Sequence, residues 1–214
     1  MTAEITKVKI CGLRRPEDVA FVNAAGADYA GFVFYPKSHR NVSIAQAEKL
    51  IHQLDDSIQS VAVCVSPSRE LYQQLCQLQP DIIQIHGEVP RIALDAGGIP
   101  LWQAVNLKSA GSLSEALIHH PKITGYVIDG ADYGSGKTFG WEQDAQLAEQ
   151  LRCQLREEIK DCSLILAGGL NIENIETGLH VFRPDIVDVS SGVETDGWKE
   201  SKKINEFVRK VKQS

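Results

Sequence analysis

The feature that most constrains the fold of this 214-residue chain is a regular alternation of short apolar runs with segments of helical periodicity. The starts of eight such runs recur roughly every 25 residues, about the length of one strand, one helix and two short loops. Most runs are apolar without interruption, as expected for parallel strands covered on both faces. The predicted strands are residues 8–10, 29–34, 60–65, 82–85, 101–105, 125–128, 164–167 and 186–189.

Helix signals lie between these runs. Ser43 and Gln46 match a capping box, Pro16 suits a first helical turn, and Asn171 is a candidate cap for the helix that follows it. Only segment 90–96 is too short and too close to glycine for a helix to be predicted. Apolar residues at helical spacing are Leu71, Leu75 and Leu78; Leu147, Leu151, Leu155 and Ile159; Ile175 and Leu179; and Ile204, Phe207, Val208 and Val211.

Eight β/α units in a chain of this length predict an α/β protein, a small (β/α)₈ TIM barrel near the lower size limit of that fold. A doubly wound open sheet is the alternative, because periodicity alone does not show whether the sheet closes. No linker or shift in composition divides the chain, so we expect one domain over residues 1–214. In a barrel, chemistry belongs at the carboxyl ends of the strands and in the loops that follow them.

The charge balance excludes several classes of partner. With 22 basic and 28 acidic residues the net charge is −6, so nucleic acid has no broad basic face to bind. No apolar stretch approaches the 18 residues or so of a membrane span, and the first residues lack the apolar run of a signal peptide. Five cysteines without metal-site or C-x-x-C spacing indicate reduced thiols, and we expect a cytoplasmic protein.

Two strand ends carry candidate acid–base residues. Cys11 follows the first strand and could be a thiolate base if a nearby positive charge, such as that of Lys9 on the same side of the strand, lowers its pKa. From position alone a small packing cysteine is favoured, and Cys64 has the same positional claim. Asp129 ends an apolar strand, where partial desolvation suits a general acid, although a cap or loop anchor is as probable.

Two glycine-rich turns follow the last two predicted strands. Gly168 and Gly169 follow the seventh, and Ser190, Ser191 and Gly192 follow the eighth. Glycine lets backbone N–H groups approach anionic oxygens, and the loops after strands 7 and 8 form the usual phosphate site of barrels. One such turn is explained by chain reversal alone, but two at adjacent strands favour phosphate binding.

The remaining polar candidates are weaker. Arg40, after the second strand, suits a carboxylate through a bidentate fork, and His86 follows the fourth strand. An isolated surface arginine and a loop-orienting histidine are the commoner roles. Segment 134–139 (GSGKTF) fails the Walker pattern because its leading glycine is one residue out of place, so a substrate-covering loop fits better. The histidines share no helical face, so we expect no metal.

Together these blocks resemble the phosphoribosylanthranilate isomerase family. Six blocks occur in order at barrel spacing across nearly the whole chain, and their combination is highly specific although no single block is. The blocks are KICGL (9–13), GFVFYPKS (31–38) with Arg40, QIHGE (84–88), Asp129 with GSGKTF (134–139), AGGLN (167–171) and DVSSGVE (188–194).

The resemblance implies a (β/α)₈ barrel of tryptophan biosynthesis that converts an N-phosphoribosyl anthranilate to its deoxyribulose isomer by an Amadori rearrangement, without a cofactor. It makes Cys11 the general base, Asp129 the general acid, Arg40 the anthranilate-side arginine and the two glycine-rich turns the phosphate site. Gly140 stands where the family usually has aspartate. The implied partner is a small phosphorylated substrate, and the chain is expected to be a monomer or homodimer.

Two rival hypotheses belong to other classes. Another phosphate-binding barrel enzyme would need a catalytic lysine at the end of the third or fourth strand, or metal ligands, and the sequence has neither. A non-catalytic binding relative would keep the glycine-rich turns without the acid and base. Retention of both Cys11 and Asp129 argues against that second reading.

Overall fold

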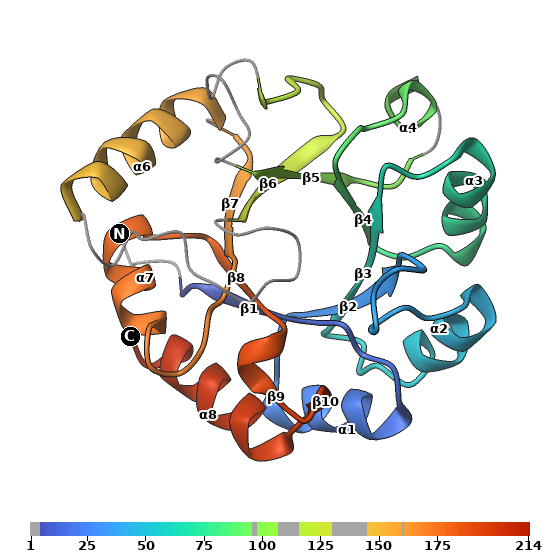
Figure 1. The fold of residues 1–214 in the computed structure, drawn as a ribbon, viewed down its shortest axis with the longest axis horizontal. Helices are drawn as coiled ribbons and strands as arrows, with labels where there is room; N and C mark the ends of the chain where they lie inside the picture. Colours follow the sequence, from blue (N-terminus) through green and yellow to red (C-terminus); the bar gives the residue numbers. More distant parts are fainter. Residues whose placement is uncertain (1–4, 96–97, 107–115, 130–144, 160) are drawn as a thin grey trace.

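The computed structural model describes residues 5–95, 98–106, 116–129, 145–159 and 161–214, and the eight predicted strands form one closed parallel barrel (Figure 1). Their order around the barrel is their order in the chain, and β8 pairs with β1 to close the ring. The predicted (β/α)₈ barrel is therefore confirmed over the open sheet. The strands are β1 (Lys7–Cys11), β2 (Tyr29–Phe34), β3 (Gln59–Val65), β4 (Ile82–His86), β5 (Leu101–Asn106), β6 (Ile123–Asp129), β7 (Ser163–Ala167) and β8 (Ile186–Val189).

Helices form an outer ring around the barrel (Figure 1). Segment 90–96, too short for a prediction, contains the five-residue helix α4. Within the part of the chain described, no helix is both long and apolar enough to cross a membrane. The helices are α1 (Pro16–Ala25), α2 (Ile44–Ile51), α3 (Arg69–Leu78), α4 (Arg91–Asp95), α6 (Ala145–Ile159), α7 (Ile175–Phe182) and α8 (Ser201–Lys212).

The predicted caps differ in outcome. Ser43 Oγ accepts a hydrogen bond from the Gln46 N–H at 3.2 Å, as predicted, but the Gln46 amide donates to another loop instead of completing the box. The prediction that Asn171 caps α7 was wrong, because α7 begins after Asn174. The Asn171 side chain instead accepts from the backbone N–H groups of Glu173 and Asn174 at 2.8 and 3.1 Å, because an intervening turn separates it from the helix.

Alternation along the strands divides the core into two layers. One large cluster joins outward-facing residues such as Ile10 to helix residues such as Phe207. A smaller cluster of inward-facing residues fills the barrel interior, where the rings of Tyr29 and Trp102 meet edge to face with centroids 5.1 Å apart. A side chain at Gly125 would come within 2.8 Å of the Trp102 ring, so this end of the interior has no spare room.

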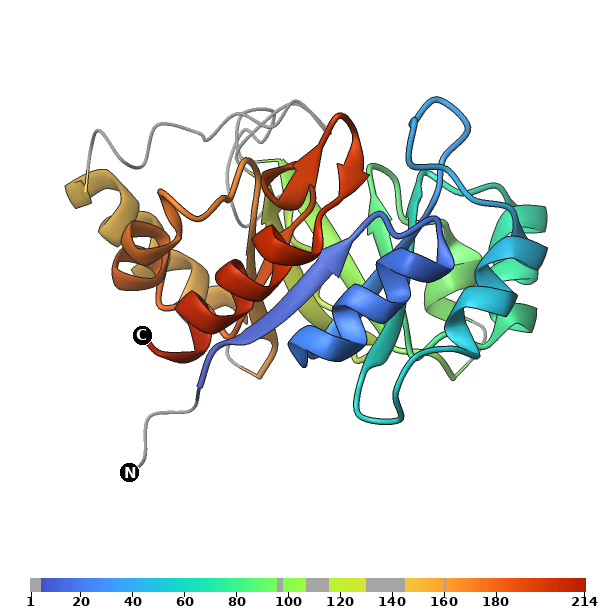
Figure 2. The same ribbon diagram turned by 90° about the horizontal axis from the view of Figure 1, so that it is seen from below.

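The two ends of the barrel have different architecture. Beyond β8 the chain forms a short 3₁₀ helix (Ser191–Val193) and a hairpin of β9 (Glu194–Thr195) and β10 (Trp198–Lys199). Figure 2 shows this hairpin on the same rim as the loop that follows β2, with the start of β1 at the opposite end. The loops after the strands therefore gather at the carboxyl end.

Three aspartates tie pairs of strands together at the amino end. Each precedes an even-numbered strand, and its carboxylate accepts a hydrogen bond of 2.7 Å from a backbone N–H of the strand before it. These bonds fix strand register at the end opposite the predicted chemistry, and sequence patterning gave no sign of them. The pairs are Asp28 with Val8, Asp81 with Ser60, and Asp185 with Leu164.

Replacing Asp81 tests this tie. Asp81 accepts from both the backbone N–H and the hydroxyl of Ser60, each at 2.7 Å. Because hydrogen bonds to a charged acceptor contribute about 2 kcal/mol, we expect Asp81→Ala to lower the free energy of unfolding by about that amount in urea denaturation. Asp56→Ala, at an exposed turn position, is the control. Equal unfolding free energies for the two variants would contradict the role of Asp81.

Candidate active site

A cavity of about 380 Å³ opens at the carboxyl end of the barrel. Most of the predicted site residues line it, although they come from six different strand ends and the loops that follow them. Gly192 is the exception, and its place beside the cavity is described below. The predicted residues that line the cavity are Cys11, Arg40, His86, Asp129, Gly168, Gly169, Ser190 and Ser191.

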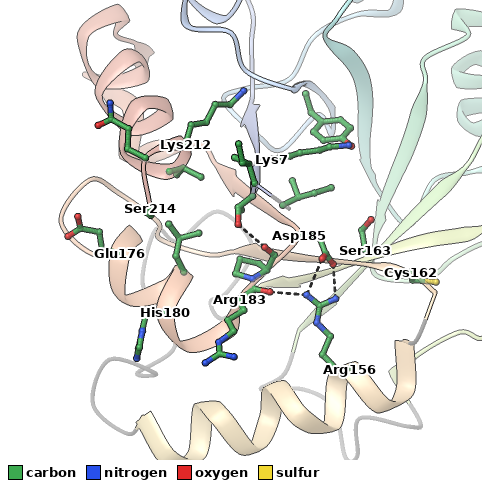
Figure 3. A pocket seen from close by; sticks show the side chains of 18 of the residues that line it. Lys7, Arg156, Cys162, Ser163, Glu176, His180, Arg183, Asp185, Lys212 and Ser214 are labelled. Carbon is green, nitrogen blue, oxygen red and sulfur yellow. Dashed lines mark hydrogen bonds and ion pairs between the residues drawn. The ribbon is translucent and has the colours of Figure 1, made fainter. Parts of the chain in front are cut away.

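A larger hollow of about 1060 Å³ lies at the opposite end, where the strands begin (Figure 3). It is lined by Lys7, Ser163 and Asp185, among others, and includes none of the predicted site residues. The Arg156 guanidinium points at the Asp185 carboxylate across it, with N–O distances of 2.8 and 3.1 Å. In barrels this end contributes stability, so the smaller cavity is the better candidate for chemistry.

Cys11 lies at the end of β1 with its side chain directed into the barrel. Its partner in the β1–β2 register is Gly31, and a Cβ there would come within 2.8 Å of the Cys11 sulfur. The absence of a side chain at Gly31 therefore makes room for the thiol. Cys64 faces the other way, into the layer between barrel and helices, and does not line the cavity. Position alone could not separate the two cysteines, but the alternation of inward and outward residues along each strand does.

A buried ion pair stands beside Cys11. The Lys9 side chain is fully buried, and its Nζ lies 2.6 Å from Asp188 Oδ2 across the β1–β8 seam. Burial lowers the pKa of Lys9, but Asp188 and Cys11 raise it more, so this lysine stays charged. The second oxygen of Asp188, Oδ1, makes no hydrogen bond within the described residues, and Asp188 lines the cavity.

The thiol of Cys11 is held in its protonated form. Burial raises the pKa of Cys11, and Asp188 raises it further, while the ammonium groups of Lys9 and Lys199 lower it. Lys9 therefore acts in the predicted direction, but desolvation is the larger effect and the net shift is upward. The thiolate forms less readily here than at an exposed cysteine.

Asp129 and His86 are the last residues of their strands. Asp129 closes β6 and is buried, opposite Ala167 in the β6–β7 register. His86 closes β4, and its Nε2 lies 2.9 Å from the amide nitrogen of Gln84. Burial and the Lys9 charge lower the pKa of His86 to about 4, so the ring is neutral near pH 7. If the Gln84 amide donates to Nε2, the neutral ring carries its proton on Nδ1.

The glycine-rich turns pack against each other. Gly168 and Gly169 both have positive φ angles, 88° and 66°, which other residues rarely adopt. A Cβ on Gly192 would lie 2.0 Å from the carbonyl oxygen of Leu170, so this glycine lets the loop after β8 approach the loop after β7. Ser190 Oγ donates to the carbonyl of Cys11 at 2.9 Å and so connects the turn to β1.

Arg40 is engaged by a partner that sequence reasoning missed. Its Nε and Nη2 form a two-point contact with the Glu194 carboxylate at 2.8 and 2.7 Å. Lys199 Nζ lies 2.7 Å from the same carboxylate, and both residues belong to the β9–β10 hairpin. Burial raises the pKa of Glu194, but Arg40 and Lys199 outweigh it and bring the pKa to about 2. Glu194 closes the DVSSGVE block, and its charge there was the only available signal.

The Lys199 ammonium also reaches the glycine-rich turn after β8. It is nearly fully buried and donates to the Ser190 carbonyl at 2.9 Å. In the described ranges, no three histidine, cysteine, aspartate or glutamate side chains are grouped as metal ligands would be. Segment 134–139 and Gly140, predicted to cover the substrate, lie outside the described residues.

The chain is similar over nearly its whole length to one family. Residues 8–210 match a family model described as N-(5'phosphoribosyl)anthranilate (PRA) isomerase. An N-(5'-phosphoribosyl)anthranilate isomerase of Clostridium kluyveri is 42% identical over 208 residues, 96% of this chain and 98% of the relative.

Solved structures agree with this similarity. The crystal structure of phosphoribosyl anthranilate isomerase from Thermotoga maritima has a TM-score of 0.78 and 32% identity, covering 98% of this chain and 100% of that one. Another phosphoribosyl anthranilate isomerase, in complex with reduced 1-(o-carboxyphenylamino)-1-deoxyribulose 5-phosphate, has a TM-score of 0.77 and 31% identity with the same coverage.

Alkylation of Cys11 tests the environment of its thiol. Because the thiolate is the reactive form and burial raises the pKa, the rate of iodoacetamide labelling should still be rising at about pH 9, beyond the pKa of a free cysteine near 8.5. Labelling is measured by mass spectrometry of the Cys11 peptide. Cys64, whose pKa burial raises to about 12, should stay unlabelled in the same samples. A rate that levels off below about pH 8 would mean that Lys9 outweighs burial.

Proposed function

The chain belongs to the N-(5'-phosphoribosyl)anthranilate isomerase family, and we propose that Cys11 and Asp129 perform the two proton transfers of the family's reaction. The enzyme is an aldose–ketose isomerase of tryptophan biosynthesis. It converts N-(5'-phosphoribosyl)anthranilate to 1-(2-carboxyphenylamino)-1-deoxyribulose 5-phosphate, and its ligand is a small phosphorylated molecule.

The observation that carries the proposal is that β1 and β6 deliver a thiol and a carboxyl group to one cavity. Asp129, as acid, protonates the ring oxygen of the ribose, and the ring opens to an iminium ion. Cys11, as base, then removes the proton from C2' and leaves an enolamine, which tautomerises to the ketone. Each step moves one proton, so the sequence needs no redox partner, and we propose that it uses no cofactor.

Lys9 partly offsets the effect of burial on the proposed base. The thiol must lose its proton before it can act, and burial disfavours the resulting anion. The fully buried ammonium of Lys9 lowers the pKa of Cys11, because a positive charge nearby stabilises the thiolate. Asp188 keeps this ammonium in place through its contact of 2.6 Å.

The rest of the cavity supports binding of the two ends of the substrate. We assign the substrate carboxylate to Arg40, because a guanidinium matches a carboxylate in planar two-point contacts. We assign the phosphate to the turns of Gly168, Gly169, Ser190 and Ser191, with Gly192 allowing their close packing. Neutral His86 lines the wall between them as a hydrogen-bonding group. A monomeric or homodimeric state and a cytoplasmic location stay predictions.

Turnover is tested directly by fluorescence. N-(5'-phosphoribosyl)anthranilate is generated from anthranilate and phosphoribosyl pyrophosphate by a transferase, and this protein is added in the presence of a metal chelator. We expect the substrate fluorescence to decay faster than spontaneous hydrolysis, with the ketose product identified by chromatography. Activity that appears only after a metal is restored would contradict the cofactor-free reaction, and binding without turnover would point to a non-catalytic relative.

The acid and base are tested by conservative substitutions. Since a positioned acid or base contributes roughly 10²–10⁴ in rate, Asp129→Asn and Cys11→Ser should each lower kcat by at least about 100-fold. Binding of the reduced product analogue, measured by calorimetry, should change little, because neither residue is assigned to the carboxylate or the phosphate.

Cys64→Ser is the matched control for the base. Cys64 lies near the end of β3 and is buried, but it faces the helices, so its substitution should leave kcat within about twofold of the parent. Near-normal turnover in Cys11→Ser would move the base to another group, and near-normal turnover in Asp129→Asn would do the same for the acid.

A further inference from the structure

We propose that Glu194, held by Lys199, is a positioning residue that fixes which edge of the Arg40 guanidinium faces the substrate carboxylate. This inference rests on the proposed assignment of Arg40 to the substrate carboxylate, and it adds the residue that orients Arg40. Neither residue of the pair touches the reacting atoms in the proposed reaction. Both lie in the hairpin that rises beside the loop after β2 (Figure 2).

Among the described residues, Glu194 contacts one edge of the guanidinium and no side chain donates to or accepts from the other edge. Glu194 takes Nε and Nη2 of Arg40 in a planar two-point contact. Nη1 and the second hydrogen of Nη2 form the other edge, which is the one left for a second carboxylate. Arg40 lines the cavity, so a ligand there meets a guanidinium whose orientation is already set.

The stem of Arg40 is fixed as well. A Cβ on Gly12 would come within 2.4 Å of Arg40 Cδ, so the methylene groups of Arg40 lie directly over the Gly12 backbone. Gly12 has a φ of 86°, and it directly follows Cys11. The loop after β1 and the carboxylate of Glu194 thus hold the arginine at its two ends.

Lys199 holds the other side of the carboxylate. Its Nζ lies 2.7 Å from Glu194 Oε1 and also donates to the carbonyl and hydroxyl of Ser190 at 2.9 and 3.3 Å. Ser190 belongs to the proposed phosphate turn. The Glu194–Lys199 pair therefore connects the groups assigned to the two ends of the substrate, and sets the distance between them.

The charges favour positioning over competition. Arg40 and Lys199 supply two buried positive charges and Glu194 one negative charge, so the cluster keeps one net positive charge for an incoming carboxylate. If Glu194 instead competed with the substrate for Arg40, its removal would tighten binding. The two roles thus predict opposite signs for the same substitution.

The test compares two substrates that differ only in the carboxylate. One is N-(5'-phosphoribosyl)anthranilate, and the other is the analogue made from aniline, which lacks that group. In Glu194→Gln we expect kcat/KM for the first to fall about tenfold, mainly through KM, and kcat/KM for the second to stay within about twofold. Asp196→Asn, in the turn of the same hairpin but exposed, should leave kcat/KM unchanged for both substrates.

Two further variants separate the possible failures. Arg40→Ala should abolish the preference for the carboxylated substrate, and adding Glu194→Gln to it should cost nothing more, because the two act as a unit. Glu194→Asp keeps the charge that the fold needs but shortens the reach, so it should lose part of the preference even if Glu194→Gln is too unstable to assay.

Four outcomes would overturn the inference. A lower KM for the carboxylated substrate in Glu194→Gln means that Glu194 competes with the substrate, and equal losses with both substrates mean a structural role only. A preference that survives Arg40→Ala refutes the assignment of Arg40 itself, and the inference with it. If Arg40→Ala loses the preference and Glu194→Gln keeps it, Arg40 binds the carboxylate but Glu194 does not position it.

Discussion

The buried pair of Lys9 and Asp188 is the interaction on which the rest of the site depends. Taking two charges out of water costs several kcal/mol per ion, and the contact of 2.6 Å between them offsets this only because both side chains are fixed in the barrel interior. The pair crosses the β1–β8 seam, so closure of the barrel is what brings it together. The same ammonium acts on both neighbouring groups: it opposes the upward shift that burial gives the pKa of Cys11, and it adds to the downward shift that burial gives the pKa of His86.

The fold was predictable because parallel strands buried on both faces have continuous apolar sequences, and all eight were found to within a few residues. Closure of the barrel could not be predicted from this pattern, because it depends on the register between β1 and β8. Lys9 and Asp188, which pair in that register, are 179 residues apart in the chain. Whether a strand side chain points into or out of the barrel could be predicted from the sequence. Cys11 lies two residues after Lys9 and therefore on the same face of β1. On β3 it is Val61 and Val63 that point into the barrel, so Cys64, directly after Val63, points outward.

The charged network around Arg40 could not be predicted from the sequence, for a different reason. The contact between Arg40 and Glu194 joins a loop after the second strand to a hairpin after the eighth, 154 residues later. No periodicity marks such a pair, because loop positions follow from packing and not from a repeating pattern. The Asn171 cap failed through a similar local effect. Its side chain satisfies the backbone of a turn, and the helix starts only after that turn ends.

The net charge of −6 makes the local arrangement of cations decisive. A negatively charged protein does not attract an anionic substrate at long range, so binding must come from groups inside the cavity. Arg40 lines the cavity and Lys9 and Lys199 are buried beside it, yet each of the three already contacts the carboxylate of Asp188 or Glu194. What the cavity offers an anion is then the second edge of a held guanidinium, the N–H groups of the glycine turns and the exposed Lys37. Such groups bind best a ligand whose carboxylate and phosphate lie at the matching distance from each other. Selectivity then arises from geometry more than from charge.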